Sequence, residues 1–128
     1  MNQINRALET VKPNVVINCI GLIKQHSIAK QHVEAIKINT LLPHELARLC
    51  DEFSAKLIHF STDCVYSGKQ GNYLDDDEPD SKDIYGITKG EGEVNSKNTL
   101  TIRSSMIGRE IFNKTELLEW AISSRDKK

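Results

Sequence analysis

Apolar residues follow two patterns along the chain, short runs typical of strands and longer stretches at helical spacing. The segments NVVINCIG (14–21), KLIHF (56–60) and TLTIRSS (99–105) are predicted to be strands. In the first, residues 15–17 are continuously apolar, which is typical of strands covered on both faces in parallel sheets. Apolar residues spaced by three and four predict a helix over residues 29–53, with a break or kink near Pro43. Further helices are predicted over residues 5–11, 84–95 and 116–123.

Strands that alternate with helices predict an α/β fold with a doubly wound parallel sheet, in which the polar stretch 63–83 is a long loop. Ligands of such sheets bind beyond the carboxyl ends of the strands. Three polar or glycine-bearing ends, at residues 18–21, 61–63 and 103–105, should therefore share one edge. In the last helix, Trp120 with Leu117, Leu118 and Ala121 is expected to help cover the sheet.

Composition narrows the classes of function that remain open. The 128 residues suffice for one modest domain, and a net charge of −1 with 27% charged residues argues against a nucleic-acid-binding surface. No apolar run is long enough to span a membrane, and the first residues lack the apolar core of a signal peptide. The three cysteines form no C-x-x-C pair and the four histidines show no ligand spacing. We therefore expect a cytoplasmic protein without a disulfide framework or a metal site.

Tyr85 and Lys89 carry the chemistry that this edge of the sheet predicts. They stand four residues apart, on one face of the predicted helix, which follows the strand that ends at Thr62. A nearby ammonium stabilises a phenolate and lowers the pKa of the phenol, while a hydroxyl can anchor a carbonyl oxygen. The alternative is a surface tyrosine with a lysine stem lying along it.

Three glycines, at positions 86, 90 and 92, interrupt the same predicted helix. Each costs about 1 kcal/mol relative to alanine inside a helix. We infer that a cofactor or a neighbouring helix approaches the backbone closely there. The alternative is a marginally stable surface helix.

Six segments resemble the dTDP-4-dehydrorhamnose reductase family of the extended short-chain dehydrogenase/reductase superfamily. They cover most of residues 12–110 and read KPNVVINCIG, INTLLPHELARLC, IHFSTDCVYSG, YLDDDEP, YGITKGEGE and TIRSSMIGRE. The resemblance implies a Rossmann-like fold and the reduction of a 4-keto-6-deoxy nucleotide sugar by NADPH. The product would serve surface polysaccharide synthesis.

The resemblance also implies roles for single residues. Tyr85 would protonate the C4 keto oxygen, Lys89 would lower the tyrosine pKa and bind the nicotinamide ribose, and Thr62 would hold the keto oxygen. Asp63 and Cys64 would face the sugar together with Thr62. The residues implied to be near the cofactor are Cys19, Ile20, Gly21, Asn39, Ser61, Tyr85, Lys89, Ser104 and Ser105. Arg103 lies in the same closing segment, where the two serines are the expected contacts.

The chain departs from the family pattern at both ends. The glycine-rich turn that seats the pyrophosphate is absent, and the only G-x-G, at residues 90–92, follows no strand and contains a glutamate. The substrate-binding region of the family would continue past residue 128. We therefore expect residues 1–128 to be a single, partial NAD(P)-binding domain: a fragment, a truncated product or one piece of a split protein. The isolated chain should be weak or inactive as an enzyme.

Three rival functions follow from the same residues. A 4,6-dehydratase is disfavoured, because Thr62-Asp63-Cys64 has a thiol where dehydratases resemble Thr-Asp-Glu. A nucleotide-sugar epimerase uses the same Tyr, Lys and Ser/Thr and stays open. A non-catalytic Rossmann-like binding module also stays open. The sequence leaves undecided the sugar, the nucleoside, whether NADH can replace NADPH, and whether the protein is a homodimer.

Overall fold

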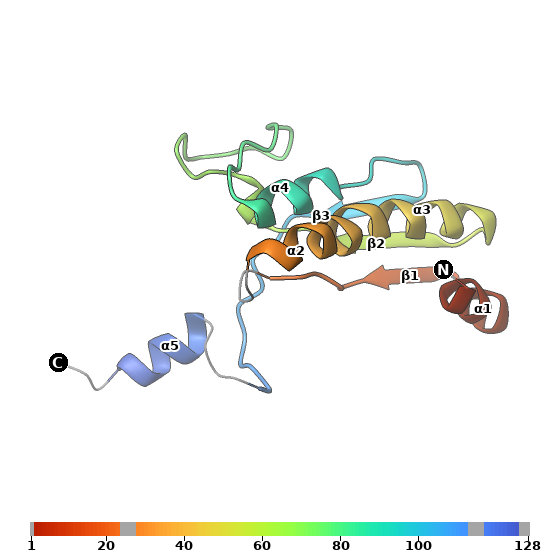
Figure 1. Cartoon of the computed structure of the whole chain (residues 1–128), viewed down its shortest axis with the longest axis horizontal. Coiled ribbons are helices and arrows are strands. Elements are labelled where there is room, and N and C mark those ends of the chain that lie inside the picture. Colours follow the sequence, from red (N-terminus) through yellow and green to blue (C-terminus); the bar gives the residue numbers. More distant parts are fainter. Residues whose placement is uncertain (1, 24–27, 113–116, 126–128) are drawn as a thin grey trace.

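The computed structural model describes residues 2–23, 28–112 and 117–125. Its helices and strands alternate as predicted (Figure 1). In chain order they are α1 (Asn2–Val11), β1 (Val15–Asn18), α2 (Ile28–Ala35), a π-helical segment (Ile36–Leu41), α3 (Leu42–Glu52), β2 (Lys56–Phe60), a 3-10 turn (Asp63–Val65), α4 (Ile84–Glu91), β3 (Thr99–Ile102) and α5 (Leu117–Ser124).

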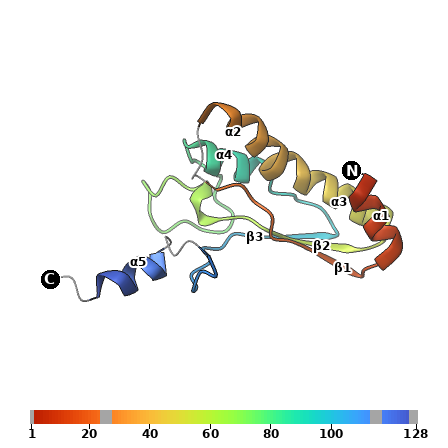
Figure 2. The ribbon, with the colours of Figure 1, turned by 60° about the horizontal axis from the view of Figure 1, so that its bottom comes forward.

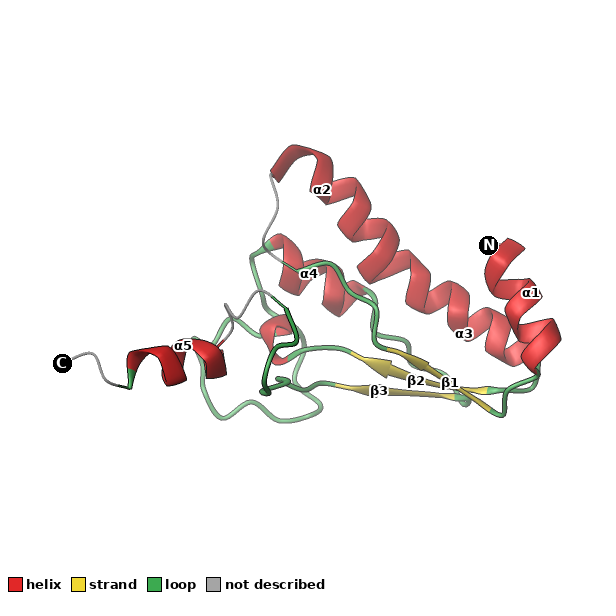
Figure 3. Ribbon diagram, turned by 90° about the horizontal axis from the view of Figure 1, so that it is seen from below, coloured by secondary structure: helices red, strands yellow, loops and turns green. Residues whose placement is uncertain are grey.

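The three strands form one parallel sheet in the order β1-β2-β3. Asn18 is paired in register with His59, and His59 with Thr101, so one row of residues crosses the sheet near its carboxyl edge. Helices α2, α3 and α4 all lie on one side of the strands (Figure 3). The predicted α/β class with a parallel, Rossmann-like sheet is therefore confirmed, as a partial fold of three strands.

The hydrophobic core lies between α3 and β2. Leu46, Ala47 and Cys50 project from the helix onto Leu57 of the strand, with Ala55 closing the end. Leu57 is only 1% exposed. This contact sets the distance between the helix layer and the sheet. It thereby positions the side chains of the helices relative to the residues at the carboxyl edge of the sheet.

The long helix over residues 28–52 is continuous, and the break predicted near Pro43 is instead a π-helical segment just before it (Figure 2). Pro43 stands in the first turn of α3, where a missing N–H is tolerated. It cannot donate to the carbonyl of Asn39, the partner that residue 43 would have in a regular helix. The backbone of Gly92 lies against that carbonyl: a Cβ at Gly92 would stand 1.8 Å from its oxygen.

The structure shows which groups approach the backbone closely at Gly86 and Gly92. A Cβ at Gly86 would stand 2.3 Å from the carbonyl oxygen of Cys64, and one at Gly92 would overlap Asn39. The groups that approach therefore belong to the protein itself: the Cys64 carbonyl and the Ser81 side chain at Gly86, and the Asn39 carbonyl at Gly92. The predicted helix over residues 84–95 is also too long, because α4 ends at Glu91 and Gly92 caps it.

Two further expectations are corrected at the C-terminal end. The third strand ends at Ile102, three residues earlier than predicted, so 103–105 lie beyond the sheet edge. Helix α5 stands apart from the sheet (Figure 1), and Trp120 is 62% exposed instead of covering it. Residues 103–112 leave β3 without regular structure and carry the chain away from the sheet. Helical spacing predicts the apolar face of α5 but not the surface that it meets. The predicted first residue of this helix, Glu116, lies outside the described residues.

Candidate active site

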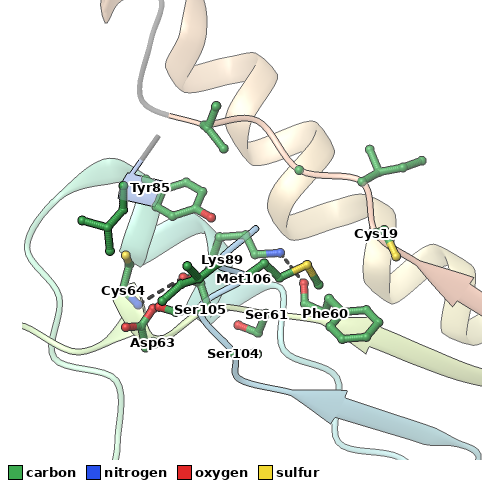
Figure 4. A pocket seen from close by; sticks show the side chains of 16 residues that line it. Cys19, Phe60, Ser61, Asp63, Cys64, Tyr85, Lys89, Ser104, Ser105 and Met106 are labelled. Carbon is green, nitrogen blue, oxygen red and sulfur yellow. Dashed lines mark hydrogen bonds between the residues drawn. The ribbon is translucent and has the colours of Figure 1, made fainter. Parts of the chain in front are cut away.

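A cavity of about 600 Å³ opens at the carboxyl edge of the sheet (Figure 4). Its walls come from the segments that follow all three strands, from α4 and from the start of α5. The lining residues are Cys19, Ile20, Gly21, Ile23, Phe60, Ser61, Thr62, Asp63, Cys64, Tyr85, Lys89, Ser104, Ser105, Met106, Ile107 and Leu117. Every residue predicted for the site lines this cavity except Asn39.

Thr62 ends the segment after β2 with its side chain held in place. Its hydroxyl accepts a hydrogen bond from the Cys64 N–H (3.2 Å) and donates to the Asp63 carboxylate (3.3 Å). The threonine thereby caps the 3-10 turn at Asp63–Val65. The polar residues after this strand thus begin a turn and also face a cavity.

Lys89 is almost fully buried, at 4% exposure, although it lines the cavity. Its Nζ donates to the carbonyl oxygen of Phe60 at 2.7 Å, which uses one of its three donors. Burial lowers the pKa of the Lys89 ammonium below its ordinary value, and the nearby Glu93 carboxylate acts in the opposite direction. The ammonium is therefore held at one place beneath the sheet edge.

Tyr85 lies one turn before Lys89 on α4, as the spacing predicts. Its ring borders the same cavity, and Figure 4 shows the phenol hydroxyl pointing inward on the side of Lys89. Asp83 starts this helix, because its carboxylate accepts the Gly86 N–H at 2.9 Å. The cap sets where the helix begins, and hence which way Tyr85 and Lys89 face.

Asn39 stands behind the cavity wall and is fully buried. Its side-chain amide accepts the Leu22 N–H (2.8 Å) and donates to the Leu22 carbonyl (3.1 Å) and to the Thr88 hydroxyl (3.1 Å). The structure thus gives Asn39 a supporting position, between the segment after β1 and the helix that carries Tyr85. It does not place Asn39 in the lining.

Ser61 and Arg103 belong to a network that sequence reasoning missed. Glu93 accepts hydrogen bonds from the Ser61 hydroxyl (2.7 Å) and from Nε and a terminal nitrogen of Arg103 (2.9 and 2.7 Å). The guanidinium also lies over the Tyr66 ring, donates to its hydroxyl and donates to the Asp77 carbonyl at 3.1 Å. Arg103 therefore faces the loop after β2, while Ser104 and Ser105 face the cavity. The sequence offered one signal, a glutamate just after the Tyr-x-x-x-Lys helix.

The described residues contain no group of three or more histidine, cysteine or acidic side chains that could hold a metal ion. Cys19, Cys50 and Cys64 are all free thiols. In the part of the chain that the structure describes, the helices are too short or too polar to cross a bilayer.

Fold and site together define the class, a partial Rossmann-like α/β protein with its polar side chains gathered beyond the strand ends. Residues 1–112 match the family model described as the RmlD substrate binding domain. The chain belongs to this family.

Relatives of known name include reductases and one subunit of a different enzyme. The dTDP-4-dehydrorhamnose reductase of Streptomyces griseus is 31% identical over 91 residues, which is 70% of this chain and 30% of the relative. Methionine adenosyltransferase 2 subunit beta of Xenopus tropicalis is 31% identical over 86 residues, 67% of this chain and 26% of the relative. The chain thus spans less than a third of the length of either protein.

Among solved structures, the dTDP-4-dehydrorhamnose reductase of Bacillus anthracis in complex with NADP superimposes with a TM-score of 0.64. It is 27% identical in sequence, and the match covers 71% of this chain and 33% of that one. The three-stranded sheet and its helices are therefore similar to a segment of a larger reductase.

Proposed function

We propose that this chain is the catalytic segment of an NADPH-dependent reductase that acts on a 4-keto-6-deoxy nucleotide sugar. One observation carries the proposal: Thr62, from the segment after β2, lines a single cavity together with Tyr85 and Lys89 of α4. A hydroxyl, a phenol and an ammonium around one space are the groups that carbonyl reduction requires. We also propose that residues 1–128 form one partial domain.

In this mechanism the keto oxygen lies between Thr62 and Tyr85. The Thr62 hydroxyl accepts from the Cys64 N–H, and its proton turns from the Asp63 carboxylate to the keto oxygen, which polarises the carbonyl. The chemistry that NADPH would supply when bound is a hydride for C4. The Tyr85 hydroxyl gives its proton to the oxygen, which leaves a secondary alcohol and a phenolate. The Lys89 ammonium stabilises the phenolate until a solvent proton replaces the one given up.

The residues present fit the nicotinamide end of the cofactor. Gly21 carries no side chain beside Lys89, and even a Cβ there would stand 3.9 Å from Nζ, so the backbone leaves room for a ligand at this wall. Lys89 with Ser104 and Ser105 would hold the nicotinamide ribose. No glycine-rich turn for the pyrophosphate occurs in the 128 residues. We therefore propose that these residues alone bind NADPH weakly, with a Kd well above micromolar.

The sugar would enter from the side of Asp63 and Cys64, which line the cavity next to Thr62. Asp63 is exposed and can accept a hydrogen bond from a sugar hydroxyl, whereas Cys64 offers a small apolar contact. Reduction at C4 would yield a 6-deoxy sugar nucleotide suited to polysaccharide synthesis.

A non-catalytic role is the second candidate, and the similarity to a subunit of methionine adenosyltransferase 2 favours it. A binding module would keep the cavity but would show no dependence on the Tyr85 hydroxyl. An epimerase, the third candidate, would use the same residues without net consumption of NADPH. Product analysis separates these outcomes.

The test is to express the full reading frame that contains these residues and follow NADPH oxidation with a panel of 4-keto nucleotide sugars. Tyr85→Phe removes only the proton donor, so turnover should fall at least about a hundredfold, the usual scale for a general acid. Tyr66→Phe is the matched control, because Tyr66 lies outside the lining residues. Undiminished turnover in Tyr85→Phe would remove Tyr85 from the mechanism, and no turnover with any sugar would favour the binding module.

A further inference from the structure

Two buried polar side chains lie next to each other beneath the carboxyl edge of the sheet, outside the set that the mechanism uses. Asn18 ends β1 at 2% exposure, and His59 lies beside it on β2 with none. Asn18 Nδ2 and His59 Nδ1 are 3.0 Å apart. Polar groups buried this deeply cost free energy unless they form hydrogen bonds. Two polar residues at these positions therefore need an explanation.

The directions of these hydrogen bonds follow from one backbone amide. The Ile20 N–H can only donate, and it meets Asn18 Oδ1 at 3.1 Å. This contact fixes which end of the Asn18 side chain is oxygen, so its Nδ2 is the end that faces His59. Because Nδ2 only donates, His59 Nδ1 must accept, and the single proton of the neutral ring lies on Nε2.

The remaining ring nitrogen makes the arrangement costly. His59 Nε2 is buried and has no hydrogen-bond partner in the described part of the chain. An apolar side chain at this position would avoid that cost. What histidine supplies here, and an apolar side chain does not, is a hydrogen-bond acceptor for Asn18.

Neutrality of the ring is a condition for this contact, because a doubly protonated ring has no acceptor. Burial is the main factor that lowers the pKa of His59, to about 4. The charged and titratable groups that face it are Lys89 from α4, Glu93 just after α4, and His44 from α3. The two basic groups reinforce the effect and Glu93 opposes it. The acceptor is thus present throughout the neutral range.

The backbone that this pair holds is a wall of the proposed cofactor site. Ile20 and Gly21 line the cavity, and Gly21 passes close to Lys89. Asn39 fixes the same segment further on, at Leu22. Two buried asparagines therefore hold this segment, and each is bonded to a second side chain: Asn18 to His59, and Asn39 to Thr88.

We propose that Asn18 and His59 form a positioning pair, in which His59 orients the Asn18 amide so that it holds the Ile20 N–H and sets the backbone of the cofactor-facing segment Cys19–Gly21. The link to the cofactor rests on the proposed function, whereas the hydrogen-bond chain from His59 to Ile20 does not.

The experiment uses the full-length protein labelled with 15N-histidine and 15N-isoleucine. Nitrogen shifts of His59 report the tautomer, hydrogen exchange reports the Ile20 amide, and titration gives the Kd for NADPH. We expect the Nε2-protonated tautomer in the wild type. His59→Leu should make hydrogen exchange at the Ile20 amide about tenfold faster and should raise the Kd for NADPH about tenfold. Each change is the effect of losing one hydrogen bond. His59→Asn, which places an acceptor near the Nδ1 position, should recover both to within about threefold.

Two more variants make the test independent of loss of folding. Asn18→Asp keeps the acceptor for Ile20 but cannot donate, so His59 should shift its proton to Nδ1 while Ile20 exchange stays slow. Thr101→Val removes a partly buried hydrogen bond to the Val94 carbonyl from the same row of the sheet without touching this segment. It should leave Ile20 exchange and the Kd unchanged.

An Nδ1-protonated tautomer in the wild type, or unchanged Ile20 exchange in His59→Leu, would overturn the proposal. Wild-type protein that binds no NADPH would count against the proposed function alone, since tautomer and exchange still decide the positioning pair.

Discussion

The two faces of the sheet are made of different residues and have different neighbours. Four of the six residues on the face under the helices are polar. These six are Val16, Asn18, Leu57, His59, Thr99 and Thr101. The opposite face is apolar apart from Lys56, with Val15, Ile17, Ile58, Phe60, Leu100 and Ile102. Yet Leu57 on the first face is 1% exposed, whereas Ile17 and Leu100 on the second are 60% and 56% exposed.

The difference teaches that apolar character alone does not locate the core of this chain. No helix covers the second face in the described residues (Figure 3), although parallel sheets are usually covered on both. The covered face holds its polar residues by specific hydrogen bonds, and the Asn18–His59 pair lies near the edge where the cavity opens. Stability and site geometry should therefore depend on the covered face far more than on the other.

The largest effect should come from Leu57→Ala. This residue is the part of β2 that packs on α3, and truncation of a buried leucine leaves a cavity that costs about 2–5 kcal/mol of unfolding free energy. Urea denaturation followed by circular dichroism measures it. If Leu57→Ala lost less unfolding free energy than Leu100→Ala, the helices would not pack on this face.

A pH titration of stability tests the polar part of the covered face. The pKa of His59 is about 4 in the folded chain and near 6.5 in the unfolded one. Above pH 6.5 the ring is neutral in both states, so it adds no pH dependence to the free energy of unfolding. As pH falls from 6.5 to 4, the unfolded chain takes up the proton first. Stability should drop by about 3 kcal/mol and then level off.

His59→Leu isolates this contribution, since all other titrating groups remain. The difference in unfolding free energy between wild type and variant should change with pH only between about 4 and 6.5. A pH-independent difference would mean that His59 is not held neutral by burial.

Close contact within the helix layer is tested by Gly92→Ala. The added Cβ would meet the Asn39 carbonyl, so α4 must move away from the π-helical segment, at about 1–3 kcal/mol for overpacking. Gly108→Ala is the matched control, because no atom of the described residues lies within 4 Å of its Cβ position. Equal unfolding free energies for the two variants would contradict the close approach.

The smallest effect should come from the uncovered face. Leu100→Ala removes a side chain that is more than half exposed, so the unfolding free energy should change by no more than about 0.5 kcal/mol. The same denaturation assay measures it. A cost comparable with that of Leu57→Ala would show that this face is covered in the protein, and would remove the contrast between the two faces.

Much of this molecule follows from local pattern. Alternating strands and helices, the parallel sheet, and the placement of Thr62, Tyr85 and Lys89 at one edge were predictable, because residue spacing sets element type and parallel strands end at a common edge. Pro43 also correctly predicted an irregularity in the long helix, although the irregularity is a π-helical segment and not a break.

The incorrect predictions share one physical cause. Trp120 was expected on the sheet, and the helix that is α4 was predicted to extend four residues too far. Each depends on which distant segment a residue meets, and periodicity contains no such information. Glu93 and Arg103 likewise acquire their roles only when the ends of β2, β3 and α4 converge.

The amino-acid sequence by itself determined the order of the elements, the chemistry available at the strand ends and the family to which the chain belongs, because these depend on residue type and spacing. Only the tertiary structure decided that Gly92 lies against the Asn39 carbonyl, that Arg103 turns from the cavity toward Tyr66, and that Asn18 lies between the Ile20 N–H and His59 Nδ1. These facts rest on contacts between residues far apart in the chain, which form only when the sheet and its helices assemble.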